Sequence, residues 1–192
     1  IDSLLAGRSA LALFPTGGGK SLCYQLPALM FDGLTLVVSP LIALMKDQVE
    51  ALQARSISAA RLDSTLEQSE ISDIYNEMEN GTLKLLYVAP ERLANEGFLR
   101  RLRRCKIDML AVDEAHCISE WGHNFRPDYL KLTLLARDLK IPRVLALTAT
   151  ATPRVAAQIR ERFQIAEEDH TQTAFARPNL IFRVHPVSEA ER

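Results

Sequence analysis

The sequence lacks the features that mark several specialised classes of protein. Its three cysteines, Cys23, Cys105 and Cys117, stand far apart, with no Cys-x-x-Cys pair and no Cys/His ligand spacing, which argues against a zinc site or a disulfide framework. No apolar run approaches the roughly 18 residues that a membrane span needs, and no signal-peptide pattern is present. The net charge is only -1, so any contact with nucleic acid would have to come from a local stripe of basic residues. We therefore expect a soluble intracellular protein with reduced thiols and no membrane partner.

What the sequence does contain is a regular alternation of apolar runs and helical patterns. Its 192 residues, 47% of them hydrophobic, suit one α/β domain with a little chain left over. Short apolar runs predict strands at residues 10–14, 34–38, 58–62, 84–88, 107–112 and 143–147. Such runs alternating with helices are typical of a parallel sheet covered on both faces, in which ligands lie beyond the carboxyl ends of the strands.

Two of the expected helices show an apolar periodicity. Leu22, Leu26, Leu29 and Met30 fall at helical spacing, and Pro27 should kink or stop that helix. Residues 41–55 form the second pattern, whose apolar face is expected to be Leu41, Leu44, Met45, Val49 and Leu52. Asp63 and Ser64 are expected to cap a polar helix from about residue 67 to 79.

A glycine-rich turn follows the first strand. It runs from Phe14 to Ser21 and holds Thr16, Gly17, Gly18, Gly19 and Lys20. Backbone N–H groups left unpaired in such a turn, backed by a helix dipole, suit the phosphates of a nucleotide. Lys20 is placed to reach the β- and γ-phosphates, and the Ser21 hydroxyl to bind Mg²⁺. The full motif has glycine where Phe14 stands; the alternative is an ordinary turn that ends by chance in Gly-Lys-Ser.

Two carboxylates stand directly after the strand at 107–112. Asp113 is expected to hold the coordination shell of Mg²⁺, and Glu114 to orient or deprotonate an attacking water. His116 completes the Asp-Glu-Ala-His tetrapeptide and is included among the catalytic candidates. Alone, the tetrapeptide could be the acidic first turn of a helix, but its combination with Gly-Lys-Ser predicts ATP hydrolysis.

A hydroxyl-rich turn follows the strand at 143–147. Thr152 is expected to cap the helix that begins at Pro153. Thr148 and Thr150 could belong to the same turn, or they could hydrogen-bond to the active site and report the state of the bound phosphates to a nucleic-acid groove. Their spacing does not decide between these two interpretations.

An aromatic loop follows the acidic tetrapeptide. Trp121 and Phe125 stand there among His123, Arg126 and other polar residues, a composition typical of a surface loop. Exposed aromatic rings beside Arg and His can stack on single-stranded bases. The alternative is that Trp121 packs inward as a local core anchor.

Together these stretches resemble the RecQ family of DNA helicases. The similarity covers residues 14–28, 38–48, 87–93, 113–116 and 147–152 in the family's order, and its most specific part is the loop at 117–129. Asn124 stands where the family commonly has Asp. The resemblance implies a three-layer RecA-like fold, ATP and Mg²⁺ as cofactors, and single-stranded and duplex DNA as partners. It also implies 3′-to-5′ translocation and a role in DNA repair or recombination.

The resemblance also suggests DNA contacts and domain limits. It points to Ser39, Lys46 and Arg92 at the strand ends as contacts to the DNA backbone, although each could be an ordinary solvated side chain. It implies a RecA-like ATP-binding domain at 1–165, and at 166–192 a linker and the start of a second RecA-like domain. The location would be the bacterial cytoplasm, with the nucleoid, or the eukaryotic nucleus.

Two other functions stay open from the sequence. One is an RNA helicase, or another nucleic-acid-stimulated ATPase of the same superfamily, against which the loop at 121–129 argues. The other is a non-catalytic nucleic-acid-binding module, which would need a broken motor, whereas Lys20, Ser21, Asp113 and Glu114 are all present. Phosphoryl transfer in this class uses a cationic finger from a second domain. We therefore expect residues 1–192 alone to hydrolyse ATP slowly at best and to unwind nothing.

Overall fold

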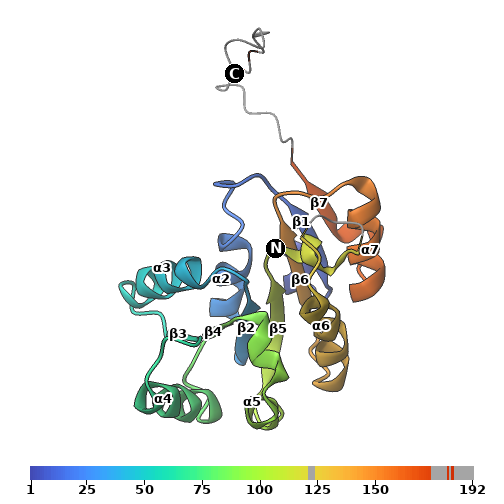
Figure 1. The fold of residues 1–192 in the computed structure, drawn as a ribbon. Helices are drawn as coiled ribbons and strands as arrows, with labels where there is room; N and C mark the ends of the chain where they lie inside the picture. Colours follow the sequence, from blue (N-terminus) through green and yellow to red (C-terminus); the bar gives the residue numbers. More distant parts are fainter. Residues whose placement is uncertain (121–123, 174–180, 182, 184–192) are drawn as a thin grey trace, which may run out of the picture.

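A parallel β-sheet forms the centre of the protein (Figure 1). The computed structural model describes residues 1–120, 124–173, 181 and 183. Its strands are β1 (Ala10–Leu13), β2 (Leu34–Val38), β3 (Ala59–Leu62), β4 (Leu85–Val88), β5 (Ile107–Val112), β6 (Val144–Thr148) and β7 (His170–Gln172). They lie in the order β3-β4-β2-β5-β6-β1-β7, with β3 at the left of Figure 1 and β7 at the right, and every pairing between neighbours is parallel. The predicted α/β class is confirmed.

Helical segments connect the strands. They are α1 (Asp2–Leu5), α2 (Leu22–Met30), α3 (Ile42–Gln53), α4 (Gln68–Glu79), η1 (Pro90–Ala94), α5 (Glu96–Leu102), η2 (Ala115–Ile118), α6 (Pro127–Asp138), α7 (Pro153–Phe163) and η3 (Glu167–Asp169). As expected, Thr152 caps α7, because its side chain accepts a hydrogen bond from the N–H of Val155.

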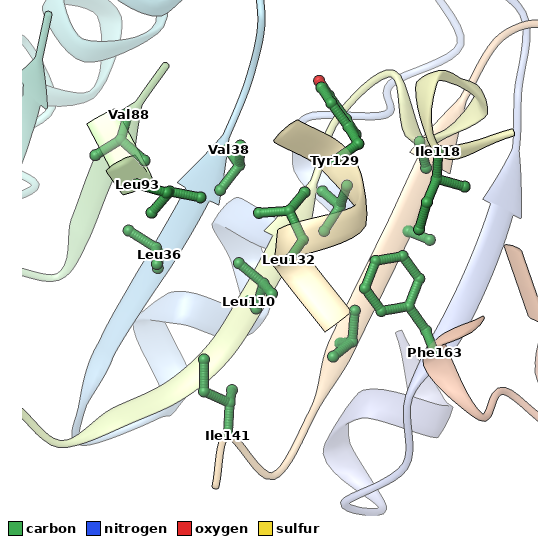
Figure 2. Packing of buried hydrophobic residues seen from close by; sticks show 14 of the residues in the cluster. Leu36, Val38, Val88, Leu93, Leu110, Ile118, Tyr129, Leu132, Ile141 and Phe163 are labelled. Atoms are coloured by element: carbon green, nitrogen blue, oxygen red, sulfur yellow. The ribbon is translucent and has the colours of Figure 1, made fainter. Parts of the chain in front are cut away.

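Two hydrophobic clusters pack on opposite faces of the sheet and make a three-layer domain. Alternate residues along each strand point to opposite faces, so Leu36 and Val38 join one cluster and Val37 joins the other. The first cluster, drawn in Figure 2, buries side chains of α4, α5, α6 and α7 against the sheet. The second buries side chains of α1, α2 and α3.

The seventh strand is not indicated by the sequence pattern. Residues 170–172 pair with β1, in the register Leu11↔His170, so the sheet continues past the domain boundary expected at 165/166. The Arg8 guanidinium holds the buried Asp169 carboxylate, with Nε and Nη2 within 3.0–3.1 Å of its oxygens. Residues 174–180, 182 and 184–192, most of the expected linker and second-domain start, lie outside the described residues.

Helix α2 forms where the apolar spacing predicts it, but that spacing does not mark its buried side. The buried side chains of this helix are Tyr24, Pro27 and Ala28. The leucines that give the helical spacing are exposed, and so is Met30, whose exposed fraction is 62%. Helix α2 also does not stop at Pro27 but continues through it to Met30. A helix with apolar residues on two sides gives no periodic signal that tells the buried side from the exposed one.

Two smaller corrections concern α3 and α4. Helix α3 buries Met45, Val49 and Leu52 as expected, but Leu41 and Leu44 are exposed. Helix α4 is capped by Glu67, which forms a capping box with Glu70, and not by Asp63 and Ser64. No helix within the described ranges is long and apolar enough to cross a membrane.

Candidate functional site

The glycine-rich turn joins the end of β1 to the start of α2. Its first residue is tied to the neighbouring strand, because the N–H of Phe14 donates to the carbonyl of Thr148. Gly17 and Gly19 have φ angles of 79° and 78°, in a region that side chains rarely adopt. The turn therefore depends on glycine at these two positions.

Within this turn the lysine folds back onto the loop. Lys20 Nζ donates to the carbonyl oxygens of Phe14, at 3.2 Å, and Pro15, at 3.4 Å. The N–H of Gly18 donates to the Pro15 carbonyl at 2.9 Å, so this N–H, expected to be unpaired, is bonded inside the loop. The lysine ammonium consequently lies in the concavity of the turn.

A pocket of about 380 Å³ brings the turn together with the acidic pair. The candidate residues that line it are Thr16, Gly17, Gly19, Lys20, Ser21, Asp113 and Glu114. They come from the ends of β1 and β5, which are not neighbours in the sheet. The carboxyl ends of parallel strands meet at one edge, and this explains how residues about 95 positions apart share a pocket.

Four hydrogen bonds hold Asp113, and one of them runs from its N–H to the Val38 carbonyl at 2.9 Å. Its carboxylate accepts from Ser39 Oγ, at 3.2 Å, and from the N–H of Glu114, at 3.0 Å. Its carbonyl oxygen accepts from the Tyr129 hydroxyl at 2.9 Å. Burial, and secondly the neighbouring charge of Glu114, raise the pKa of Asp113 above its usual value. A nearby cation would relieve that cost.

Glu114 is paired with His116. His116 Nδ1 lies 3.2 Å from Glu114 Oε2 and 2.8 Å from Thr148 Oγ1. The hydrogen bond with His116 lowers the pKa of Glu114, against the effect of burial. Contacts with Cys117 Sγ and then with Glu114 raise the pKa of His116 to about 9, so the imidazole is protonated at neutral pH. Glu114 also has φ 48° and ψ 43°, an uncommon left-handed conformation for a residue other than glycine.

The threonines at the end of β6 are linked to His116 by hydrogen bonds. Thr148 is fully buried, and its Oγ1 accepts from the N–H of Thr150 and donates to the Thr150 carbonyl, both at 3.2 Å. Through His116, the turn after β6 is therefore in hydrogen-bond contact with the acidic pair after β5.

A second cleft, of about 480 Å³, adjoins the pocket. Its lining includes Glu114, His116, Phe125, Arg126 and Thr150. Thr16, Leu41 and Glu114 line both cavities, so the two lie on either side of the same residues. Phe125 and Arg126 are half-buried, and Arg126 Nη1 lies 3.8 Å from Glu91 Oε1. Trp121 and His123 lie outside the described residues.

The three residues suggested as DNA-backbone contacts differ in their surroundings. Ser39 is buried and its hydroxyl is turned to Asp113, so it is not exposed to a DNA strand here. Lys46 is exposed and lies 3.8 Å from Glu50 one turn along α3. Arg92 donates to the Tyr75 hydroxyl at 2.8 Å and lines a third groove, of about 430 Å³, along the same edge of the sheet.

Some residues at this site were not indicated by the sequence. Tyr24, Gln48, Leu41 and Leu44 line the pocket beside the glycine-rich turn. The leucines carry a helical apolar pattern, which predicts burial in a core rather than exposure to a pocket. The bond from Tyr129 to Asp113 joins residues 16 positions apart, and no spacing rule predicts it.

This arrangement defines a class of protein. A parallel sheet, a glycine-rich turn with Lys and Ser after its first strand, and an acidic pair after a second strand are the parts of a RecA-like P-loop nucleoside triphosphatase domain. The model of the DEAD/DEAH box helicase family matches residues 1–159. The chain belongs to the DEAD/DEAH box helicase family.

Curated relatives agree with the resemblance to RecQ helicases. The chain is 49% identical to ATP-dependent DNA helicase RecQ of Bacillus subtilis over 180 residues, which are 93% of the chain and 30% of that protein. It is 46% identical to the Pasteurella multocida protein of the same name and 44% identical to ATP-dependent DNA helicase Q1 of Rattus norvegicus. These two matches cover 95% and 96% of the chain. The chain spans only 29% and 31% of these two relatives.

Solved structures agree on the fold. The Pyrococcus furiosus Hef helicase domain superposes with a TM-score of 0.63 at 20% identity, over 89% of this chain and 36% of that one. A hypothetical ATP-dependent RNA helicase from Sulfolobus tokodaii gives a TM-score of 0.67 at 19% identity, over 90% of this chain and 50% of that one. At such identities the likeness concerns the fold alone.

Proposed function

We propose that this chain is the N-terminal motor domain of an ATP-dependent DNA helicase of the RecQ type. In this proposal it couples ATP hydrolysis to 3′-to-5′ translocation on single-stranded DNA and to duplex unwinding in repair or recombination. The observation that carries it is that the two cavities adjoin at a shared candidate catalytic residue. The pocket of the glycine-rich turn and the cleft lined by Phe125 and Arg126 share Glu114, the candidate group for activating water.

The chemistry of the pocket suits a nucleoside triphosphate. Lys20 would move from the loop carbonyls to the β- and γ-phosphates, because a phosphate oxygen carries more negative charge than a peptide carbonyl. Thr16, Gly17, Gly19 and Ser21 would surround the phosphates with backbone N–H groups, and the N–H of Gly18 would join them after leaving the Pro15 carbonyl. Glu114, ionised and oriented by His116, would accept the proton of the attacking water.

The site also fits Mg²⁺. Asp113 and Ser21 line the same pocket and offer the oxygen ligands that Mg²⁺ prefers. Across the described parts of the chain, no cluster of three or more His, Cys, Asp or Glu side chains could hold a metal. That agrees with Mg²⁺ at nucleotide sites, where one or two protein ligands share the ion with phosphate oxygens and waters. When bound, the ion would neutralise charge on the transferring phosphoryl group.

The remaining assignments extend the proposal. Phe125, with Trp121 and His123 of the same loop, would stack on DNA bases, while Lys46, Arg92 and Arg126 would meet its phosphates. Thr148 and Thr150 would couple the two sites, because their hydrogen bonds reach His116. Residues 1–165 would be the ATP-binding domain, completed by a second RecA-like domain. The compartment would be the bacterial cytoplasm or the eukaryotic nucleus.

An ATPase assay with two nucleic acids tests the proposal. The full-length protein that contains this chain should hydrolyse ATP faster with single-stranded DNA than with RNA of the same sequence. It should also displace a strand from a 3′-tailed but not from a 5′-tailed duplex, and Lys20→Ala should do neither. Stronger stimulation by RNA would instead support an RNA helicase, which the DNA-helicase names of the similar relatives make the weaker alternative.

A further inference from the structure

Tyr129 links the start of α6 to the end of β5. Its side chain is fully buried in the first hydrophobic cluster, where Figure 2 shows it beside the sheet. Its hydroxyl donates a hydrogen bond of 2.9 Å to the carbonyl oxygen of Asp113. Burial raises the pKa of Tyr129, so the phenol stays protonated and keeps its donor.

The acceptor is half of the peptide group that joins the two catalytic carboxylate residues. That peptide consists of the carbonyl of Asp113 and the N–H of Glu114. Tyr129 binds its oxygen, while the Asp113 carboxylate accepts from its N–H at 3.0 Å. The orientation of this peptide therefore sets the directions in which both side chains leave the backbone.

This peptide directly precedes Glu114, whose left-handed backbone conformation must be held by surrounding contacts. Glu114 has φ 48° and ψ 43°, which is costly for a residue with a side chain and persists only where surrounding contacts hold it. Tyr129 supplies one of those contacts from a different element of the fold. A shift of α6 would therefore act, through this hydrogen bond, on the peptide that precedes Glu114.

The other end of the link is the aromatic loop. Phe125 and Arg126 directly precede α6, and both line the cleft that Glu114 and His116 also line. The N–H of Arg126 donates to the Cys117 carbonyl at 2.9 Å, and the N–H of Tyr129 donates to the Arg126 carbonyl at 3.0 Å. Tyr129 is therefore fixed by short hydrogen bonds to the segment that a ligand in the cleft would contact.

We propose that Tyr129 is a positioning residue through which the segment 124–126 controls the geometry of the Asp113–Glu114 peptide. A nucleic acid bound against Phe125 and Arg126 would move or stiffen the first turn of α6. The hydroxyl of Tyr129 would pass that change to the peptide and align Glu114 with the attacking water. This inference rests on the proposed function, because it assumes a nucleic-acid-stimulated ATPase.

The test uses Tyr129→Phe in the full-length protein. This change removes the hydroxyl and keeps the buried ring. We expect the kcat of ATP hydrolysis at saturating single-stranded DNA to fall by about 10-fold or more, since small misplacements of catalytic groups can cost up to about 100-fold. The basal rate should fall less than the stimulated rate, while the KM for ATP and the Kd for single-stranded DNA, measured by fluorescence anisotropy, should each change less than about 2-fold.

Thr133→Val is the matched control. Its hydroxyl also belongs to α6, but it donates to the Leu130 carbonyl, at 3.0 Å, within the helix itself. This variant should keep the full stimulation by DNA. Both variants are compared at a temperature at which thermal melts show them folded.

Each result has a definite meaning. Full stimulation in Tyr129→Phe, or an equal loss of basal and stimulated rates, would overturn the positioning role while leaving the proposed function intact. An equal loss of stimulation in Thr133→Val would assign the effect to the stability of α6 and overturn it as well. An unmodified protein whose ATPase does not respond to single-stranded DNA would contradict the proposed function itself, and this inference with it.

Discussion

His116 Nδ1 lies 2.8 Å from Thr148 Oγ1, and this contact joins the turns that follow β5 and β6. The same nitrogen lies 3.2 Å from the Glu114 carboxylate. A protonated imidazole can serve both partners, because its N–H is shared between a carboxylate and a hydroxyl that donates its own proton elsewhere. The charge state of His116 therefore decides how firmly the candidate water-activating group is held.

The first prediction concerns pH. The pKa of His116 is raised to about 9 from an ordinary value near 6.5, so its stabilising effect is complete below pH 6.5 and is lost as the pH rises through 9. We expect His116→Gln to destabilise the domain by about 1–3 kcal/mol at pH 6 and by much less at pH 9.5. Urea unfolding of both proteins at the two pH values measures this. A difference that does not change with pH would mean that His116 is not held as an ion pair.

The second prediction concerns Lys20. In the described part of the chain its ammonium donates to two carbonyl oxygens of its own loop, at 3.2 and 3.4 Å, and Lys20 is not part of either hydrophobic cluster. Lys20→Ala should therefore leave the melting temperature almost unchanged while abolishing ATP hydrolysis by the full-length protein. Lys131→Ala, which removes an exposed lysine of α6, is the control and should retain activity. Normal turnover by Lys20→Ala at saturating ATP would rule out the assigned role.

The third prediction separates the two carboxylates. Glu114→Gln should cut hydrolysis by a factor on the order of 10²–10⁴ while Mg²⁺-dependent ATP binding persists, since Glu114 acts on the water. Asp113→Asn should instead weaken the Mg²⁺-dependent part of nucleotide binding. Equilibrium binding of a fluorescent ATP analogue, with and without Mg²⁺, distinguishes them. If Glu114→Gln lost binding in parallel with turnover, Glu114 would belong to the metal site instead.

The sequence predicts most of the sheet and the composition of the site. Six strands are found within one or two residues of their expected positions, because a strand buried on both faces is a continuous apolar run. The glycine-rich turn and the acidic pair share a pocket because both follow strand ends of a parallel sheet. Each of these inferences depends on chemistry that is local in the sequence.

What the sequence does not predict depends on contacts between distant residues. Strand β7 consists of three polar residues, His170, Thr171 and Gln172. They form a strand because they pair with the edge of β1, a contact between residues distant in the sequence. The exposed leucines of α2 have the same spacing as buried ones. The hydroxyl of Tyr129 reaches Asp113 only because α6 packs over β5, and a buried tyrosine elsewhere would look the same in the sequence.

The fourth prediction tests how β7 is held. The Asp169 carboxylate is 3% exposed and depends on the Arg8 guanidinium. Arg8→Ala would leave that charge poorly compensated, and we expect the free energy of unfolding to fall. Amide hydrogen exchange at residues 170–172 should also become faster. Arg104→Ala, at an exposed arginine, serves as the control. Unchanged exchange in Arg8→Ala would show that strand pairing alone fixes β7.

The last prediction concerns the aromatic loop. Phe125 is half-buried in the cleft that reaches Glu114, so a base stacked on its ring would lie close to the candidate catalytic centre. Stacking contributes about 1–3 kcal/mol per base, so Phe125→Ala should weaken binding of single-stranded DNA by roughly 5- to 150-fold. It should also lower the DNA-stimulated ATPase far more than the basal rate, and Trp121→Ala should do the same.

Phe125→Trp keeps an aromatic face and should restore both properties. If Phe125→Ala is as stable as the unmodified protein and still fully stimulated, the ring does not couple DNA to ATP hydrolysis. A large fall in melting temperature would instead identify Phe125 as part of the local core.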